Sequence, residues 1–220
     1  MNSNAKMKRS ALAAAGLILV MILIFVATGI GQESLQVFKT PEQYTQTLLR
    51  DPPTLRMVIG FDNAFILLYS TCFLLLGRYI VRLGGNRTLA LAGTTLLMLT
   101  AALDMAENLH FLTMIAMAQS SIPISAGEVS LQVWESLIKF HVSYVGLFLL
   151  GLVIPASTPA LRLLTFCLKY VQWPVGMLIY VGPELWAKPL VFARLSFFLA
   201  GMLIVAFTDW VKTGDSGAQA

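Results

Sequence analysis

The chain alternates long apolar runs with short polar connections. Six runs are long enough to cross a bilayer, which takes about 20 mostly apolar residues in a helix that rises 1.5 Å per residue. They cover residues 11–30, 57–81, 88–118, 131–154, 159–181 and 189–211. The pattern predicts an all-α, polytopic membrane protein, a six-transmembrane-helix bundle that forms one membrane domain over residues 1–220.

The longest polar connection, residues 32–56, follows the first apolar run. Residues 40–43 (Thr-Pro-Glu-Gln) have the cap, the proline at the first helical position and the amide at the third that typify a helix start. Residues 51–53 (Asp-Pro-Pro) end this helix, because a residue before proline avoids the helical conformation. We expect a short helix on the outer surface between the first two spans, with a plain connecting loop as the alternative.

Three other connections carry local signals. Residues 83–87 (Leu-Gly-Gly-Asn-Arg) predict a tight turn, since glycine and asparagine adopt positive φ, so the second and third spans should form an antiparallel hairpin. Ser125 and Glu128 have the spacing of a capping box that starts the fourth span. Residues 157–159 (Ser-Thr-Pro) start the fifth span in the same way.

Basic residues at the ends of the apolar runs predict the orientation, because lysine and arginine concentrate in cytoplasmic connections. With six crossings, one side of the membrane receives Lys6, Lys8, Arg9, Arg78, Arg82, Arg87, Arg162 and Lys212. We therefore expect a bacterial-type inner membrane protein with both termini in the cytoplasm. The first run exceeds the apolar region of a signal peptide and lacks a clear A-x-A site, which favours an uncleaved anchor.

Composition narrows the class of protein further. Hydrophobic residues make up 57% of the chain and charged residues 12%, with a mean hydropathy of +0.77, whereas soluble domains are about 25% charged. The net charge of +4 arises largely at span ends, so no basic patch with interleaved aromatic residues remains for nucleic acid. The expected partners are the lipid bilayer and other membrane subunits. Cys72 and Cys167 lie inside apolar runs, which argues against a disulfide or a zinc knuckle.

Ionisable residues inside the apolar runs are the strongest functional signal. Asp104, Glu107 and Asn108 lie in the third run, where a charged side chain costs several kcal/mol unless it is paired or solvated. At 100° per residue these three side chains share one helix face. Polar residues of neighbouring spans reach similar depth in the outer half of the bilayer. The predicted cluster comprises Asp62, Asn63, Tyr69, Asp104, Glu107, Asn108, Glu135, Lys139 and Arg194.

The charges of this cluster do not balance. Asp62, Asp104, Glu107 and Glu135 face two permanent cations, Lys139 and Arg194. A buried acid without a partner takes up a proton or recruits a cation. The leading hypothesis is binding or passage of a proton, a cation or a small polar ligand, with Asp104 and Glu107 as central groups. In the alternative, the charges only lock the helices of an accessory subunit.

The two histidines suggest an enzyme as a third class. Glu107 and His110 have the i, i+3 spacing of carboxylate metal sites, so these two residues with Asp104 or Asp62 could bind zinc, iron or manganese. Alternatively, His110 and His141 could ligate one haem across two helices. In the simpler interpretation both histidines are hydrogen-bonded to neighbours. The sequence lacks G-x-S-x-G, Walker and H-E-x-x-H motifs, so a metal-dependent membrane hydrolase or oxidase would be the enzyme.

The orientation can be tested by labelling single cysteines in intact cells. Because the basic residues concentrate on one side, a cysteine at Gly84 should be cytoplasmic, and cysteines at Glu42 and Ser125 should be external. An impermeant thiol reagent should therefore label positions 42 and 125 only. Labelling of position 84 from outside would overturn the predicted orientation and with it the depth of the cluster.

Overall fold

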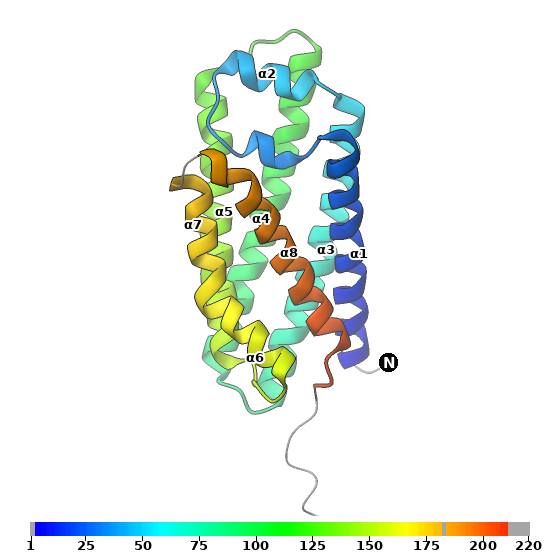
Figure 1. The fold of residues 1–220 in the computed structure, drawn as a ribbon, viewed down its shortest axis with the longest axis vertical. Coiled ribbons are helices and arrows are strands. Elements are labelled where there is room, and N and C mark those ends of the chain that lie inside the picture. The colour runs from blue at the N-terminus through cyan, green and yellow to red at the C-terminus, as the bar shows by residue number, and fades with distance from the viewer. Residues whose placement is uncertain (1–2, 182–183, 211–220) are drawn as a thin grey trace, which may run out of the picture.

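The computed structural model describes residues 3–181 and 184–210, and its elements there are helices (Figure 1). The long helices are α1 (Ser3–Thr28), α3 (Pro52–Arg82), α4 (Arg87–Gln119), α5 (Ala126–Val153) and α8 (Glu184–Phe207). The short elements are the 3₁₀ turn η1 (Gln32–Leu35), α2 (Pro41–Leu49), α6 (Pro159–Phe166), the π-helical turn η2 (Cys167–Val171) and α7 (Gln172–Val181). The all-α prediction is confirmed.

Five helices are long and apolar enough to cross a membrane: α1, α3, α4, α5 and the Pro189–Phe207 part of α8. The remaining predicted span, residues 159–181, is helical throughout but divides into α6, η2 and α7. Pro174 explains the break, because a proline removes the hydrogen bond to the carbonyl four residues earlier and its ring collides with it. That carbonyl belongs to Tyr170, inside the π turn, which is a common way for a helix to absorb such a defect.

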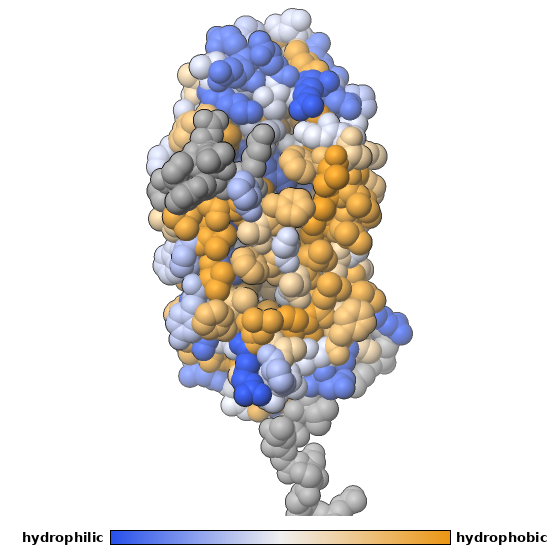
Figure 2. Space-filling view, in the orientation of Figure 1, coloured by the Kyte–Doolittle hydropathy of each residue, from blue (hydrophilic) through white to orange (hydrophobic). Residues whose placement is uncertain are grey.

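The outer surface of the bundle is apolar. Leu23 of α1, Leu67 of α3 and Leu109 of α4 are 58%, 61% and 66% exposed. In Figure 2 apolar residues cover the middle of the visible face, and hydrophilic residues gather at both ends. Apolar exposure of this extent is typical of a lipid-facing surface, which agrees with a location in a membrane.

The predicted short helix between the first two spans is α2, which lies across the end of the bundle away from the N-terminus (Figure 1). Thr40 Oγ1 accepts from the Gln43 backbone N–H, and the Gln43 side chain accepts from the Thr40 N–H, so the capping box is present. Tyr44 and Leu48 are buried, whereas Leu49 is 43% exposed. Burial, with a smaller contribution from nearby carboxylates, raises the pKa of Tyr44.

The other predicted helix starts and turns are also confirmed. Gly84 has a φ of +87°, and the Asn86 side chain caps α4 by accepting from the Leu89 N–H. Ser125 and Glu128 form the second capping box at the start of α5. Thr158 Oγ1 accepts from the Leu161 N–H and caps α6.

Two glycines bring α4 and α5 into close contact. A Cβ on Gly93 would lie 3.0 Å from the carbonyl oxygen of Gly146, and a Cβ on Gly146 would lie 3.1 Å from that of Gly93. Small residues let helix backbones approach in this way inside membranes. The close packing sets how far a side chain of α5 must reach to touch α4.

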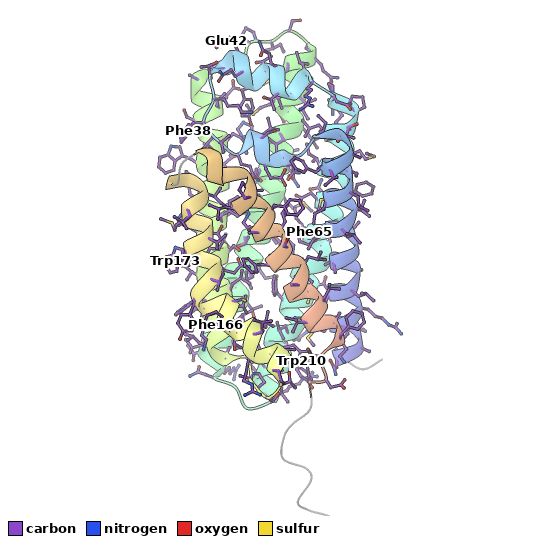
Figure 3. The ribbon with its side chains drawn as sticks, viewed as in Figure 1. Phe38, Glu42, Phe65, Phe166, Trp173 and Trp210 are labelled. Carbon is purple, nitrogen blue, oxygen red and sulfur yellow. The ribbon has the colours of Figure 1, made fainter. Side chains whose placement is uncertain are left out.

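The first and last helices meet at the end of the bundle away from α2. Lys8 Nζ lies 3.3 Å from Asp209 Oδ1, and the Tyr79 hydroxyl donates to the backbone carbonyl of Trp210. Figure 3 labels Trp210 at this end. From there α8 runs diagonally across the bundle and moves away from α1 towards α7 (Figure 1).

The contact between α4 and α5 can be tested by filling it. In Gly146→Val the new Cβ would lie 3.0 Å from Leu97 Cγ and 3.1 Å from the Gly93 carbonyl oxygen. Overpacking of this kind costs about 1 to 3 kcal/mol. We expect a lower melting temperature in detergent. Gly60→Val is the matched control, because Gly60 is exposed and has no atom within 4 Å of its Cβ position. Equal melting of both variants would refute the close contact.

Candidate functional site

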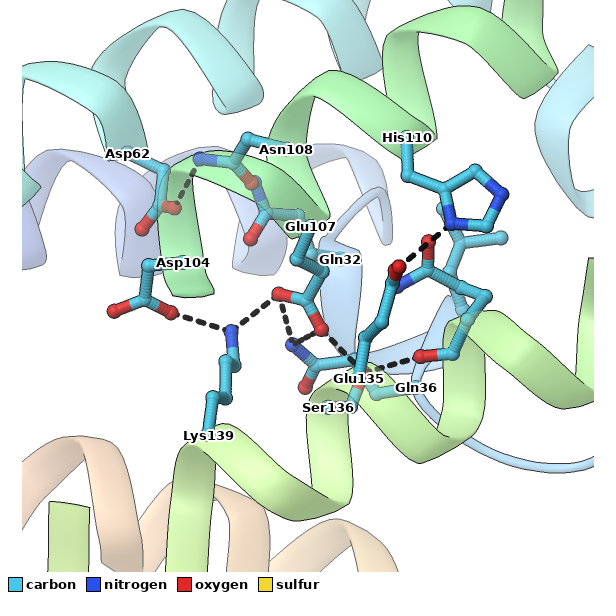
Figure 4. A network of polar contacts seen from close by, with 12 residues as sticks. Gln32, Gln36, Asp62, Asp104, Glu107, Asn108, His110, Glu135, Ser136 and Lys139 are labelled. Atoms are coloured by element: carbon cyan, nitrogen blue, oxygen red, sulfur yellow. Dashed lines mark hydrogen bonds and ion pairs between the residues drawn. The ribbon is translucent and has the colours of Figure 1, made fainter. Parts of the chain in front are cut away.

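Lys139 lies at the centre of a buried polar network between α4 and α5 (Figure 4). Its Nζ is 2.6 Å from Asp104 Oδ1 and also forms an ion pair with Glu107. Lys139 is 4% exposed and Glu107 0%. The sequence placed these three residues at one depth on inward faces, and their predicted contact is confirmed.

Glu107 has three partners, two from α5 and one from the connection between η1 and α2. The Ser136 hydroxyl donates to its Oε1, the Gln36 amide nitrogen lies 3.4 Å from its Oε2, and Lys139 pairs with the same carboxylate. A buried carboxylate is tolerated only with such partners. Ser136 and Gln36 were not predicted. Ser136 could have been found, because it lies one helical turn from Lys139, whereas Gln36 comes from a polar connection that gave no sign of folding inward.

A second set of hydrogen bonds joins α3 to α4. Asn108 Nδ2 donates to Asp62 Oδ2 at 2.7 Å and to Asn63 Oδ1 at 2.8 Å. Gln32, also missed by sequence reasoning, donates to Asn108 Oδ1 at 3.1 Å. The Tyr69 hydroxyl of α3 donates to Asp104. The structure therefore brings Asp62, Asn63, Tyr69 and Asn108 together as predicted.

Arg194 of α8 joins this group through an aromatic ring. Its Cζ lies 3.9 Å from the centroid of Phe140, whose ring is also 4.8 Å from Lys139 Nζ. Arg194 is 9% exposed. A guanidinium over a ring face is an attractive cation–π arrangement, so the predicted position of Arg194 beside the cluster agrees with the structure.

Glu135 does not join the cluster, contrary to the prediction. Its Oε2 lies 2.8 Å from His110 Nδ1, in a separate pair whose side chains are 29% and 18% exposed (Figure 4). Glu135 precedes Lys139 by one helical turn, but its carboxylate turns to the histidine of α4. Helical periodicity predicted the helix face on which Glu135 lies, but it could not predict that Glu135 would contact His110.

The structure does not bring together the ligands predicted for a metal or for haem. His110 contacts Glu135 instead of Glu107, and His141 lies 2.7 Å from the Leu137 carbonyl and 3.1 Å from Met177 Sδ. Over residues 3–181 and 184–210, no three His, Cys, Asp or Glu side chains converge as a set of ligands. Both histidines have local partners, which is the simpler of the predicted interpretations.

A cavity of about 150 Å³ opens beside the network. It is lined by residues of α1, η1, α3, α4, α5, α7 and α8. Glu33, Asp62, Asp104, Lys139 and Arg194 supply its charged wall. A cavity of roughly this volume holds a benzene-sized molecule. The charged cluster is therefore a wall of an internal space and not only a contact between helices.

Aromatic side chains of α3 and α8 also line the cavity. The ring centroid of Phe65 lies 5.1 Å from that of Tyr69 and 5.7 Å from that of Phe198, and Phe73 is 6.2 Å from Phe198. Figure 3 shows Phe65 between α3 and α8. Rings at these separations attract one another. They also offer aromatic faces and edges to whatever occupies the cavity.

Two polar atoms at this cavity are buried without a hydrogen-bond partner in the described part of the chain, Glu33 Oε2 and the Tyr144 hydroxyl. Tyr144 is 2% exposed, and its ring packs on Gly176 of α7, where any side chain would collide with it. Buried polar groups are nearly always paired. An unpaired one beside a cavity indicates a place for water or a ligand.

The charges at the cavity remain unequal. Among the described residues, the acids are Glu33, Asp62, Asp104 and Glu107, and the cations are Lys139 and Arg194. The predicted cluster and the observed one both contain four acids and two cations, but Glu33, from the connection between α1 and α3, has replaced Glu135. Lys139 is already engaged by Asp104 and Glu107. Lys139 and Arg194 together offset two of the four negative charges. Asp62 and Glu33 are the two acids that form no ion pair among the described contacts.

The role of Lys139 can be tested by removing its charge. Lys139→Met leaves Asp104 and Glu107 buried without their cation, and breaking a buried pair in this way costs about 3 to 5 kcal/mol. We expect strong destabilisation in detergent melts. The triple variant with Asp104→Asn and Glu107→Gln should regain most of that loss. Lys6→Met, at an exposed position, is the control, and a Lys139→Met variant as stable as this control would contradict the network.

Comparison of the chain with protein family models, with curated proteins and with solved structures finds no match. A membrane helical bundle by itself implies no particular activity. The function is therefore argued from the residues of the site.

Proposed function

We propose that this protein binds a proton or a cation in the cavity, with Asp62 as the principal acid. The observation that carries the proposal is the excess of acids around the cavity, where Asp62 and Glu33 form no ion pair among the described contacts. A carboxylate in an apolar bundle is costly without a counter-charge. Binding of a positive charge removes that cost.

The geometry supports Asp62 as the central residue, in place of the two central groups that the sequence suggested, Asp104 and Glu107. Asp104 and Glu107 both contact Lys139, so each of them already has an ion-pair partner. Asp62 accepts a hydrogen bond from Asn108 but has no ion pair among the described contacts. Its side chain lines the cavity. In this proposal Asp104, Glu107 and Lys139 hold the helices, and Asp62 binds the incoming charge.

The proposal includes six crossings of a bacterial-type inner membrane, with both termini in the cytoplasm. The Lys8–Asp209 ion pair supports an even number, since it joins the beginning of α1 to the end of α8. Five helices are long and apolar enough to cross a membrane. In this proposal the sixth crossing is the interrupted helix of residues 159–181. The cavity then lies in the outer half, beneath η1 and α2.

The other two classes have narrower support. An accessory subunit would need the Lys139 network alone, and would leave the cavity and the unpaired atoms of Glu33 and Tyr144 without a role. A metal-dependent hydrolase or oxidase would need a set of ligands that the described residues do not bring together. Cation binding uses the cavity, the excess acids and the aromatic wall at once.

Asp62→Asn tests the proposal. A ligand that binds only the folded protein stabilises it by mass action, so the melting temperature of the wild type in nanodiscs should rise with methylammonium or sodium concentration, or on acidification. Asp62→Asn should fold, melt higher without cation because an excess acid is gone, and lose this dependence.

The control is Glu42→Gln, which removes an exposed acid from α2 and should keep the wild-type response. A wild type that responds to neither cations nor protons would refute the proposal. The same conclusion would follow if Asp62→Asn retained the full response.

A further inference from the structure

A second cavity, of about 210 Å³, adjoins the first and is almost entirely apolar. It lies among α3, α5, α6, η2 and α8, with side chains such as Leu76, Leu150 and Leu164 in its wall. Cys167 and Leu168 of the π turn also line it. The break in the helix over residues 159–181 therefore borders an empty apolar space instead of a packed core.

The two cavities share three wall residues, Phe73, Gln172 and Phe198. The first cavity has acids on one wall, and the second offers hydrocarbon and aromatic carbon. α3 and α8 contribute residues to the walls of both cavities, and the shared side chains can change rotamer. We call the two adjoining cavities the chamber: the first has acids in its wall, and the wall of the second is almost entirely apolar.

The acidic end reaches the lipid-facing surface. Phe25 of α1 and Phe192 of α8 both line the first cavity, yet they are 38% and 43% exposed. Phe25 is in the last turn of α1 and Phe192 is in the first half of α8. Figure 1 shows α8 moving away from α1 towards this end of α1. In Figure 2 apolar residues cover the middle of the same face. A molecule dissolved in the bilayer could enter here without passing through water.

We propose that the ligand is a membrane-soluble amphiphile with an ammonium head group and an apolar tail. This inference rests on the proposed cation site and names the class of cation. The ammonium lies against Asp62 and Glu33, where acids are in excess, and it can donate hydrogen bonds to them. The tail passes Phe73 and Phe198 into the apolar cavity.

The shape of the chamber favours this class over an inorganic cation or an anionic lipid. A hydrated metal ion would fill only the acidic end and would leave the adjoining apolar cavity unused. An anionic head group would bring one more negative charge to a wall that already has too many. An ammonium also gains from the aromatic ring faces of Phe65 and Tyr69.

The head group is tested with dodecylammonium and dodecanoate, which share a chain and differ in charge. Both are added at equal mole fraction to the protein in phosphatidylcholine nanodiscs, and the melting temperature is followed. Dodecylammonium should raise it saturably, and dodecanoate should not. Asp62→Asn should weaken the effect of dodecylammonium at least tenfold. Equal shifts by the two amphiphiles would mean unspecific partitioning and would overturn the inference.

The tail is tested with variants, because a long chain concentrates in the bilayer whether or not it binds. Gly201 lines the apolar cavity, and its Cβ position is 3.6 Å from Leu164 Cδ1, an ordinary contact. Gly201→Phe should place a ring in the cavity and weaken dodecylammonium at least tenfold, with the methylammonium response unchanged. Gly16→Phe is the control, since Gly16 is exposed with no atom near its Cβ position.

A second measurement uses Cys167, which lines the apolar cavity and is partly exposed. In a Cys72→Ser background, dodecylammonium should slow its modification by N-ethylmaleimide, and methylammonium should not. If methylammonium acts through Asp62 but dodecylammonium neither protects Cys167 nor depends on Gly201, the inference fails and the cation site stands. If neither amine depends on Asp62, both proposals fail together.

Discussion

The structure depends on one buried ammonium that two carboxylates share. Lys139 of α5 contacts Asp104 and Glu107, which lie one turn apart on α4. Charges at this depth are costly alone, and the attraction repays their burial only when the geometry is good. Gly93 and Gly146 supply that geometry, since they let the two backbones approach closely enough for the lysine to reach both acids. Packing and electrostatics in the bundle are therefore coupled.

The polar network also explains why the connection after α1 folds inward. Gln32 donates to Asn108 and Gln36 contacts Glu107, so η1 covers the end of the cluster with amides that satisfy its oxygens. Thr40 then starts α2, which buries Tyr44 and Leu48 over the same end of the bundle. The connection between α1 and α3 is thus part of the site. It also adds Glu33 to the wall of the cavity.

The interruption between α6 and α7 lies beside the apolar cavity. Pro174 prevents a regular helix, and the π turn that absorbs it presents Cys167 and Leu168 to an apolar space. A straight, well-packed helix would be expected to fill that space, because protein interiors are close-packed. The acidic excess and the adjoining apolar cavity are consequences of separate features, and their adjacency is the basis for proposing an amphiphilic cation.

The sequence by itself determined the membrane class, the helical fold and most helix starts. These follow from local physics: apolar runs set the spans, and Thr40, Asn86 and Ser125 cap their own helices. Helical periodicity also put Asp104, Glu107 and Lys139 on inward faces. Only the tertiary structure decided which groups meet.

Glu135 pairs with His110, and Gln36 reaches Glu107. Asp62 is left beside a cavity without an ion pair among the described contacts. The physical reason is that periodicity fixes a side chain's direction relative to its own helix. The rotation and spacing of neighbouring helices, and the path of the connection between α1 and α3, come from packing between segments distant in the chain.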